Sequence, residues 1–200
     1  MNTLLPAAPL AALLAALIVG PAHALPWTVL VKSTAGEPLA DAVVAVELRA
    51  QTSRAAPGAK AEMAQRERQF QPHVLVVQTG TAVNFPNFDT VRHHVYSFSP
   101  VKTFDIKLYS GTPAEPVLFD KPGIATLGCN IHDKMSAHIV VVDTPMFAKT
   151  DAQGLLKLDL PAGEHNLKVW HPRVGRPVLL GQRISVTPPG GQSQVSLSLE

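Results

Sequence analysis

Short apolar segments separated by turn-forming residues run along the chain from Trp27 to its C-terminus, and this pattern limits the folds open to it. The segments are wholly apolar or alternating and rich in β-branched residues, which is typical of strands. Sequences such as "TAGEP", "QTGT", "DAQG" and "TPPGGQ" lie between them and predict turns. The predicted strands are 27–32, 42–48, 73–78, 81–85, 94–98, 104–109, 117–119, 123–127, 138–143, 155–160, 165–170, 183–186 and 195–199. Many short strands at this spacing predict an all-β fold built from β-sandwiches.

Helix is expected at one place at most. No segment has the apolar period of a helix longer than about three turns. The best candidate is 59–69, "AKAEMAQRERQ", which could equally be a linker that runs into a strand.

The first 24 residues contain no Lys, Arg, Asp or Glu. An apolar run from Leu10 to Val19 is followed by Gly20-Pro21 and then by "AHA", which has the A-x-A form of a cleavage site. We interpret residues 1–24 as a secretory signal peptide, with an uncleaved membrane anchor as the alternative. The interpretation predicts a periplasmic protein in a bacterium, with no stable membrane insertion after cleavage.

The charge balance points away from nucleic acid. The chain has 17 Lys and Arg residues against 15 Asp and Glu, a formal net charge of +2. It shows no basic stripe, no aromatic RNA-binding run and no zinc-finger spacing. We therefore expect no nucleic-acid partner.

The only cysteine, Cys129, lies in "GCNIHDKM" together with His132 and Met135. A single cysteine in an exported chain cannot form an internal disulfide, and a free thiol would be exposed to oxidation unless something holds it. Thiolate and thioether ligands favour copper, imidazole suits copper or zinc, and one cysteine is too few for a structural zinc site. The competing chemistry is a Cys-His nucleophile, but the predicted strand-loop-strand context supplies no helix beneath the cysteine.

A copper site with two histidines, one cysteine and an axial methionine needs a second histidine. The segment "FPNFDTVRHHVYSF", 85–98, offers His93 and His94 at the start of a predicted strand. Because side chains alternate along a strand, the two histidines lie on opposite faces, and the pattern alone leaves either face open to the core.

At these motifs the segment 63–143 resembles the cupredoxins, the plastocyanin and amicyanin family. The matching parts are "FQPHVLVVQTGTAVNFPN" at 70–87, the late C-x-x-H-x-x-M loop in its short, amicyanin-like form, and the closing "SAHIVVVD". The segment is also similar to exported cupredoxin-like proteins labelled methylamine utilisation proteins. The resemblance implies a Greek-key β-sandwich with one type 1 copper ion, held by His93, Cys129, His132 and Met135. His94 stands where the family has an asparagine, which leaves it as a neighbour that orients the ligands or as an alternative first ligand.

A second resemblance covers the two ends of the mature chain. The segments 31–48 and 150–172 are similar to the two halves of the carboxypeptidase regulatory-like module, an immunoglobulin-like or transthyretin-like sandwich. This resemblance implies that the cupredoxin is inserted in, or fused to, a smaller β-sandwich; a single enlarged sandwich is the alternative. The implied parts are the signal peptide 1–24, the first part of the small module 25–57, the cupredoxin domain 58–146 and the second part of the small module 147–200.

The resemblance to cupredoxins implies a non-enzymatic, exported electron carrier whose partner is a redox protein such as a cytochrome c or a periplasmic dehydrogenase. It also implies that electrons leave through His132. Copper delivery, storage or sensing without electron transfer is the alternative function. A structural adhesion or carbohydrate-binding sandwich is a third hypothesis.

Overall fold

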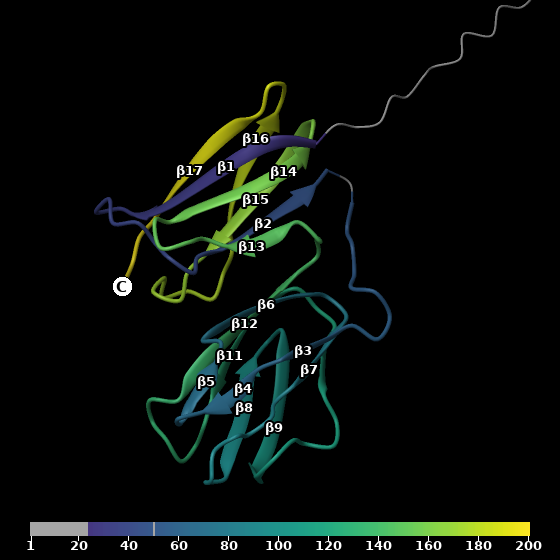
Figure 1. Cartoon of the computed structure of the whole chain (residues 1–200), viewed down its shortest axis with the longest axis vertical. Helices are drawn as coiled ribbons and strands as arrows, with labels where there is room; N and C mark the ends of the chain where they lie inside the picture. The colour runs from purple at the N-terminus through teal and green to yellow at the C-terminus, as the bar shows by residue number, and fades with distance from the viewer. Residues whose placement is uncertain (1–23, 50) are drawn as a thin grey trace, which may run out of the picture.

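The computed structural model describes residues 24–49 and 51–200, and these residues form strands and no helix (Figure 1). The all-β prediction is confirmed. The predicted signal peptide lies outside the described residues except for Ala24. No helix that could cross a membrane occurs within the two described ranges.

Strands from both ends of the chain form one sandwich, which we call the terminal sandwich. Its first sheet has the order β14-β1-β17 and its second the order β13-β2-β15-β16. Alternate residues of the two sheets meet in one apolar core, which includes Val29, Val44 and Leu167. The strands are β1 (Ala24–Ser33), β2 (Val43–Leu48), β13 (Phe147–Lys149), β14 (Leu155–Pro161), β15 (Gly163–Trp170), β16 (Leu180–Val186) and β17 (Gly191–Leu197).

Strands from the middle of the chain form the central sandwich. A five-stranded sheet with the order β6-β12-β11-β8-β9 packs against the short sheets β10-β7-β3 and β4-β5, over a core that includes Phe85, Leu127 and Ile139. The strands are β3 (Lys60–Glu62), β4 (Ala64–Arg66), β5 (Gln69–Gln71), β6 (Val74–Gln78), β7 (Thr81–Asn84), β8 (His93–Ser99), β9 (Lys102–Tyr109), β10 (Val117–Phe119), β11 (Gly123–Gly128) and β12 (Ser136–Val142).

The two sandwiches lie one above the other along the long axis of the molecule (Figure 1). Val43 and Trp170 of the terminal sandwich share a third apolar cluster with Val74, Ile124 and Val140 of the central one. Strand β12 is therefore buried on both faces, since its alternate residues Ile139 and Val141 face the central core. This burial accounts for the unbroken apolar run "HIVVV", because a strand covered on both sides does not alternate.

The structure corrects the helical alternative for 59–69. The segment contains the strands β3 and β4 and the first residue of β5, not a helix. Its Lys, Glu, Gln and Ala residues favour helix only weakly, and pairing decides the outcome: β3 pairs in parallel with β7, placing Lys60 opposite Ala82. Strand β13 was not recognised from its sequence, because its three residues include no β-branched side chain. The predicted boundaries at 57/58 and 146/147, and the likeness of the terminal sandwich to a carboxypeptidase regulatory-like module, stay predictions.

Candidate metal centre

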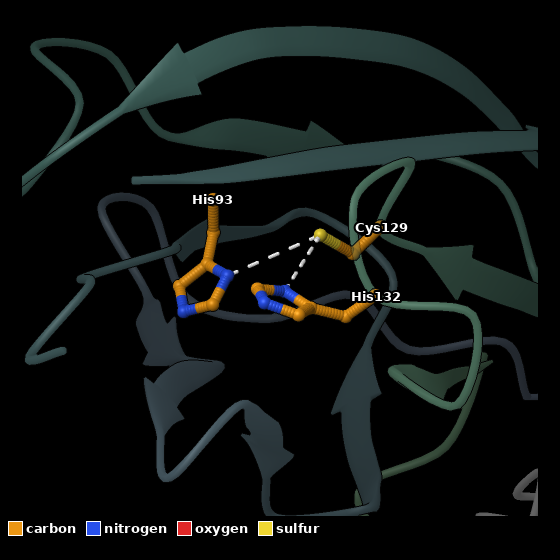
Figure 2. A group of neighbouring side chains, drawn as sticks. All are labelled: His93, Cys129 and His132. Atoms are coloured by element: carbon orange, nitrogen blue, oxygen red, sulfur yellow. Dashed lines mark hydrogen bonds between the residues drawn. The ribbon is translucent and has the colours of Figure 1, made fainter. Parts of the chain in front are cut away.

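Two distant segments of the sequence bring three side chains together in the central sandwich (Figure 2). His93 begins β8, Cys129 directly follows β11, and His132 lies in the loop between β11 and β12. The Sγ atom of Cys129 lies 4.0 Å from Nδ1 of His93 and 3.9 Å from Nδ1 of His132. The three ligand atoms all lie within 4.8 Å of one another. Two imidazole nitrogens thus face one thiol.

The loop that carries Cys129 and His132 is closed tightly on itself. The backbone N–H of Met135 donates to the carbonyl of His132 at 2.9 Å. Met135 is 2% exposed and Cys129 is 6% exposed, and both belong to the core of the central sandwich. His132, between them, remains partly exposed. The loop thus buries both sulfur atoms and leaves its histidine at the surface.

The two adjacent histidines of β8 point to different places. His93 is 0% exposed and turns toward Cys129. His94 lies on the other face, where its Nε2 is hydrogen-bonded to Asp105 of β9. The structure therefore brings together His93, Cys129 and His132 and does not bring His94 to them. The ring of His94 is directed to β9.

Strand β8 also departs from a regular ladder beside the site. Its pairing with β9 shifts register between His93 and Val95. Such an irregularity adds a residue on one strand and re-aims side chains, and it is common next to functional sites. Here His93, His94 and Val95 are all buried. Alternation therefore holds for the two histidines, but both are buried, and burial alone does not show which of them faces Cys129.

Asp89 and Asp105 are the polar neighbours that the sequence did not reveal. Asp89 Oδ2 lies 2.7 Å from Nε2 of His93. Burial acts to raise the pKa of Asp89, but hydrogen bonds from the Arg68 amide, the His93 ring and the Glu67 amide outweigh it, so the pKa is lowered. A hydrogen bond from Lys107, followed by one from His94, lowers the pKa of Asp105. The spacing Asp-x-x-x-His before the ligand strand was the available signal for Asp89.

Tyr109 lies opposite His93 in the pairing of β8 with β9. Its hydroxyl donates to the carbonyl of Phe85 at 2.6 Å and is also hydrogen-bonded to Gln65. Burial raises the pKa of Tyr109 to about 12. The phenol therefore stays neutral at physiological pH, and it adds no negative charge beside the Cys129 thiol.

The donor set fits copper. Two imidazole nitrogens and a thiolate in one plane, with a thioether as a weak fourth ligand, are the donors of a blue-copper site. Hard cations such as Mg²⁺ and Ca²⁺ prefer oxygen donors, and none of the three clustered ligand atoms is an oxygen. A structural zinc site would require more cysteines than this chain contains. The residues present are therefore suited to a copper ion.

No protein-family model and no curated protein matches this chain. Among solved structures, it is similar to a purple cupredoxin from Nitrosopumilus maritimus, with 18% identity over 42% of this chain and 98% of that chain and a TM-score of 0.36. It is similar to a reduced amicyanin variant, with 17% identity over 49% of this chain and 97% of that chain and a TM-score of 0.38. It is also similar to the copper-containing nitrite reductase from Thermus scotoductus, with 24% identity over 48% of this chain and 25% of that chain and a TM-score of 0.38.

Proposed function

We propose that this chain is an exported, non-enzymatic type 1 copper protein that transfers electrons in the periplasm. One copper ion would be held by His93, Cys129 and His132, with Met135 as the weak axial ligand. The observation that carries the proposal is the convergence of two Nδ1 atoms on the Sγ atom of Cys129, at 4.0 and 3.9 Å. Bound copper supplies a one-electron couple between Cu(I) and Cu(II).

The protein holds these ligands on a rigid frame. His93 belongs to a strand of the five-stranded sheet, and the loop with the other ligands joins two adjacent strands of that sheet. Ligands held on packed elements move little, and close packing resists rearrangement. A site that keeps its geometry in both oxidation states transfers electrons with little reorganisation. This rigidity favours electron transfer over a role in which the metal must be released.

The exposure of the ligands suggests where a partner docks. His93 is buried, whereas His132 is partly exposed and its neighbour Ile131 is 47% exposed. An apolar residue beside an exposed imidazole suits a small, transient contact of the kind that redox partners form. We propose that a cytochrome c or a periplasmic dehydrogenase docks on this loop.

Voltammetry of the copper-loaded protein tests the proposal. An electron carrier should give one reversible one-electron wave, and repeated cycles should leave the copper bound. Loss of copper on reduction, or an irreversible wave, would instead favour delivery, storage or sensing. A Cys129→Ser variant serves as the control, because it removes the thiolate while changing the side-chain volume little.

A further inference from the structure

Asp89 is the centre of a hydrogen-bond cluster that joins His93 to a distant hairpin. Its Oδ2 atom lies 2.7 Å from Nε2 of His93. The backbone N–H of Glu67 donates to Oδ1 at 2.7 Å, and that of Arg68 donates to Oδ2 at 2.9 Å. One carboxylate therefore receives hydrogen bonds from the ligand histidine and from the turn between β4 and β5.

The turn is shaped to present those two N–H groups. Glu67 and Arg68 have φ values of 53° and 58° and form the two-residue connection of the hairpin. Positive φ at both positions is the type I′ conformation, which normally selects Asn-Gly. Such a conformation costs a non-glycine residue about 1 kcal/mol or more. Successive N–H groups in a turn make an anion-binding concavity, and the carboxylate of Asp89 occupies it.

The loop that carries Asp89 is fixed independently of His93. The side chain of Asn87 donates to the carbonyls of Val91 and Tyr109, at 2.9 and 3.1 Å. Its Oδ1 accepts the backbone N–H of Asp89 at 2.9 Å. Asn87 is itself buried. Asn87 therefore fixes the backbone of Asp89 and the hairpin fixes its carboxylate, both independently of the contact with the imidazole of His93.

We propose that Asp89 is the positioning residue that presents Nδ1 of His93 to the metal and strengthens it as an electron donor. The inference rests on the proposed copper site. An ionised carboxylate only accepts hydrogen bonds, so Nε2 of His93 carries the ring proton and the lone pair of Nδ1 faces Cys129. A carboxylate behind a ligating imidazole fixes its orientation and raises its strength as a ligand.

The two histidines of the site are unequal in this respect. Among residues 24–49 and 51–200, no carboxylate is hydrogen-bonded to the ring of His132. Of the two imidazoles, only the buried ring of His93 is therefore hydrogen-bonded to a carboxylate. A stronger donor stabilises Cu(II) more than Cu(I), because Cu(II) carries the greater charge. Asp89 thus lowers the reduction potential of the site.

The test compares Asp89→Asn with Asp105→Asn. The second variant is a matched control, because Asp105 is hydrogen-bonded to His94 on the same strand but away from the clustered ligands. The affinities for Cu(I) and Cu(II) are measured with competing chelators. Loss of an outer-shell partner weakens metal binding by about 10- to 100-fold, and we expect this loss for Cu(II) in Asp89→Asn with a smaller loss for Cu(I). Each factor of ten by which the loss of Cu(II) affinity exceeds the loss of Cu(I) affinity raises the reduction potential by about 59 mV.

Equal weakening of both oxidation states would overturn the proposal, because it would indicate a purely structural role. The same shift in Asp105→Asn would also overturn it. The metal-free wild-type protein gives an independent measurement that needs neither copper nor a stable variant. Nitrogen-15 NMR at neutral pH should find the proton of the His93 ring on Nε2, and a proton on Nδ1 would contradict the inference even if the protein binds copper as proposed.

Discussion

The ring of Tyr96 packs directly on the α-carbon of Gly128, the residue that precedes Cys129. The two residues face each other across the pairing of β8 and β11. A β-carbon at position 128 would lie 2.5 Å from Cζ of Tyr96 and 2.6 Å from its hydroxyl oxygen. The close approach of the ligand strand and the cysteine strand therefore depends on a glycine at this position.

Replacing Gly128 by alanine should force Tyr96 outward or shift the cysteine loop. Overpacking of this kind costs about 1–3 kcal/mol, and we expect that loss in the free energy of unfolding of the metal-free protein, measured by chemical denaturation. A Tyr96→Ser background is the control, because it removes the ring that the new methyl group meets. An equal cost of Gly128→Ala in both backgrounds would show that the contact with Tyr96 is not the cause.

Replacing the two adjacent histidines separately should greatly lower the affinity for Cu(II) in one variant and change it little in the other. His93→Ala removes a ligand, so the affinity for Cu(II) should fall by more than the roughly 100-fold that follows loss of an outer partner. His94→Asn introduces the residue of the cupredoxin pattern and should leave the affinity within about tenfold of the wild type. Competition with a chelator of known affinity measures both. A similar large loss in the two variants would contradict the assignment of His93.

Stability should fall in mild acid because of His138, which lies between the sandwiches. Its ring centroid is 5.0 Å from that of Trp170 and 5.6 Å from that of His73, and its Nδ1 is 3.2 Å from Oγ1 of Thr126. Burial, assisted by the charge of His73, lowers the pKa of His138 from 6.5 to about 4.

Because the unfolded chain binds this proton at a higher pH than the folded one, the contribution of His138 is complete above pH 6.5. It is lost progressively as the pH falls toward about 4. Melting temperatures measured between these values should decline less steeply in His138→Gln. Burial also lowers the pKa of His171, so some decline should remain in that variant. Identical slopes for the variant and the wild type would count against the buried, neutral state of His138.

The hairpin turn of Glu67 and Arg68 should accept its preferred sequence without harm to the metal site. Both residues have positive φ, and the double variant Glu67→Asn/Arg68→Gly relieves that strain while keeping both N–H donors to Asp89. We expect the free energy of unfolding to rise by about 1 kcal/mol, with an unchanged reduction potential. Arg66→Gly, in the adjacent strand, is the control and should destabilise the protein. A shift of potential in the turn variant would mean that the side chains, and not the amides, act on Asp89.

The strand pattern was readable because each strand carries its own local signal. Apolar runs and turn residues identified even β12, whose unbroken run reflects burial on both faces. The strands of 59–71 were missed because each is three residues long and none contains a β-branched residue. Their composition favours helix slightly, and only tertiary pairing overrides that preference.

The grouping of candidate ligands was visible in the sequence for a similar reason. Cys129, His132 and Met135 share one loop, so their spacing is visible in the sequence. The choice between His93 and His94 stayed open because the sequence does not show which face of β8 meets the core, and both histidines are buried. Asp89 was missed although it lies only four positions before its partner His93. Its other two partners are the amides of a turn more than twenty positions earlier, and backbone donors leave no pattern in a sequence.

Binding of one copper ion among His93, Cys129 and His132, with the thiolate as a ligand, can be tested directly. The measurement is the absorption and paramagnetic resonance spectrum of the protein titrated with Cu(II). We expect an intense sulfur-to-copper charge-transfer band that saturates at one copper per chain. The band should be absent in Cys129→Ser and retained in His94→Asn. A colourless Cu(II) complex of the wild-type protein, or a band that survives in Cys129→Ser, would contradict binding of copper by the thiolate.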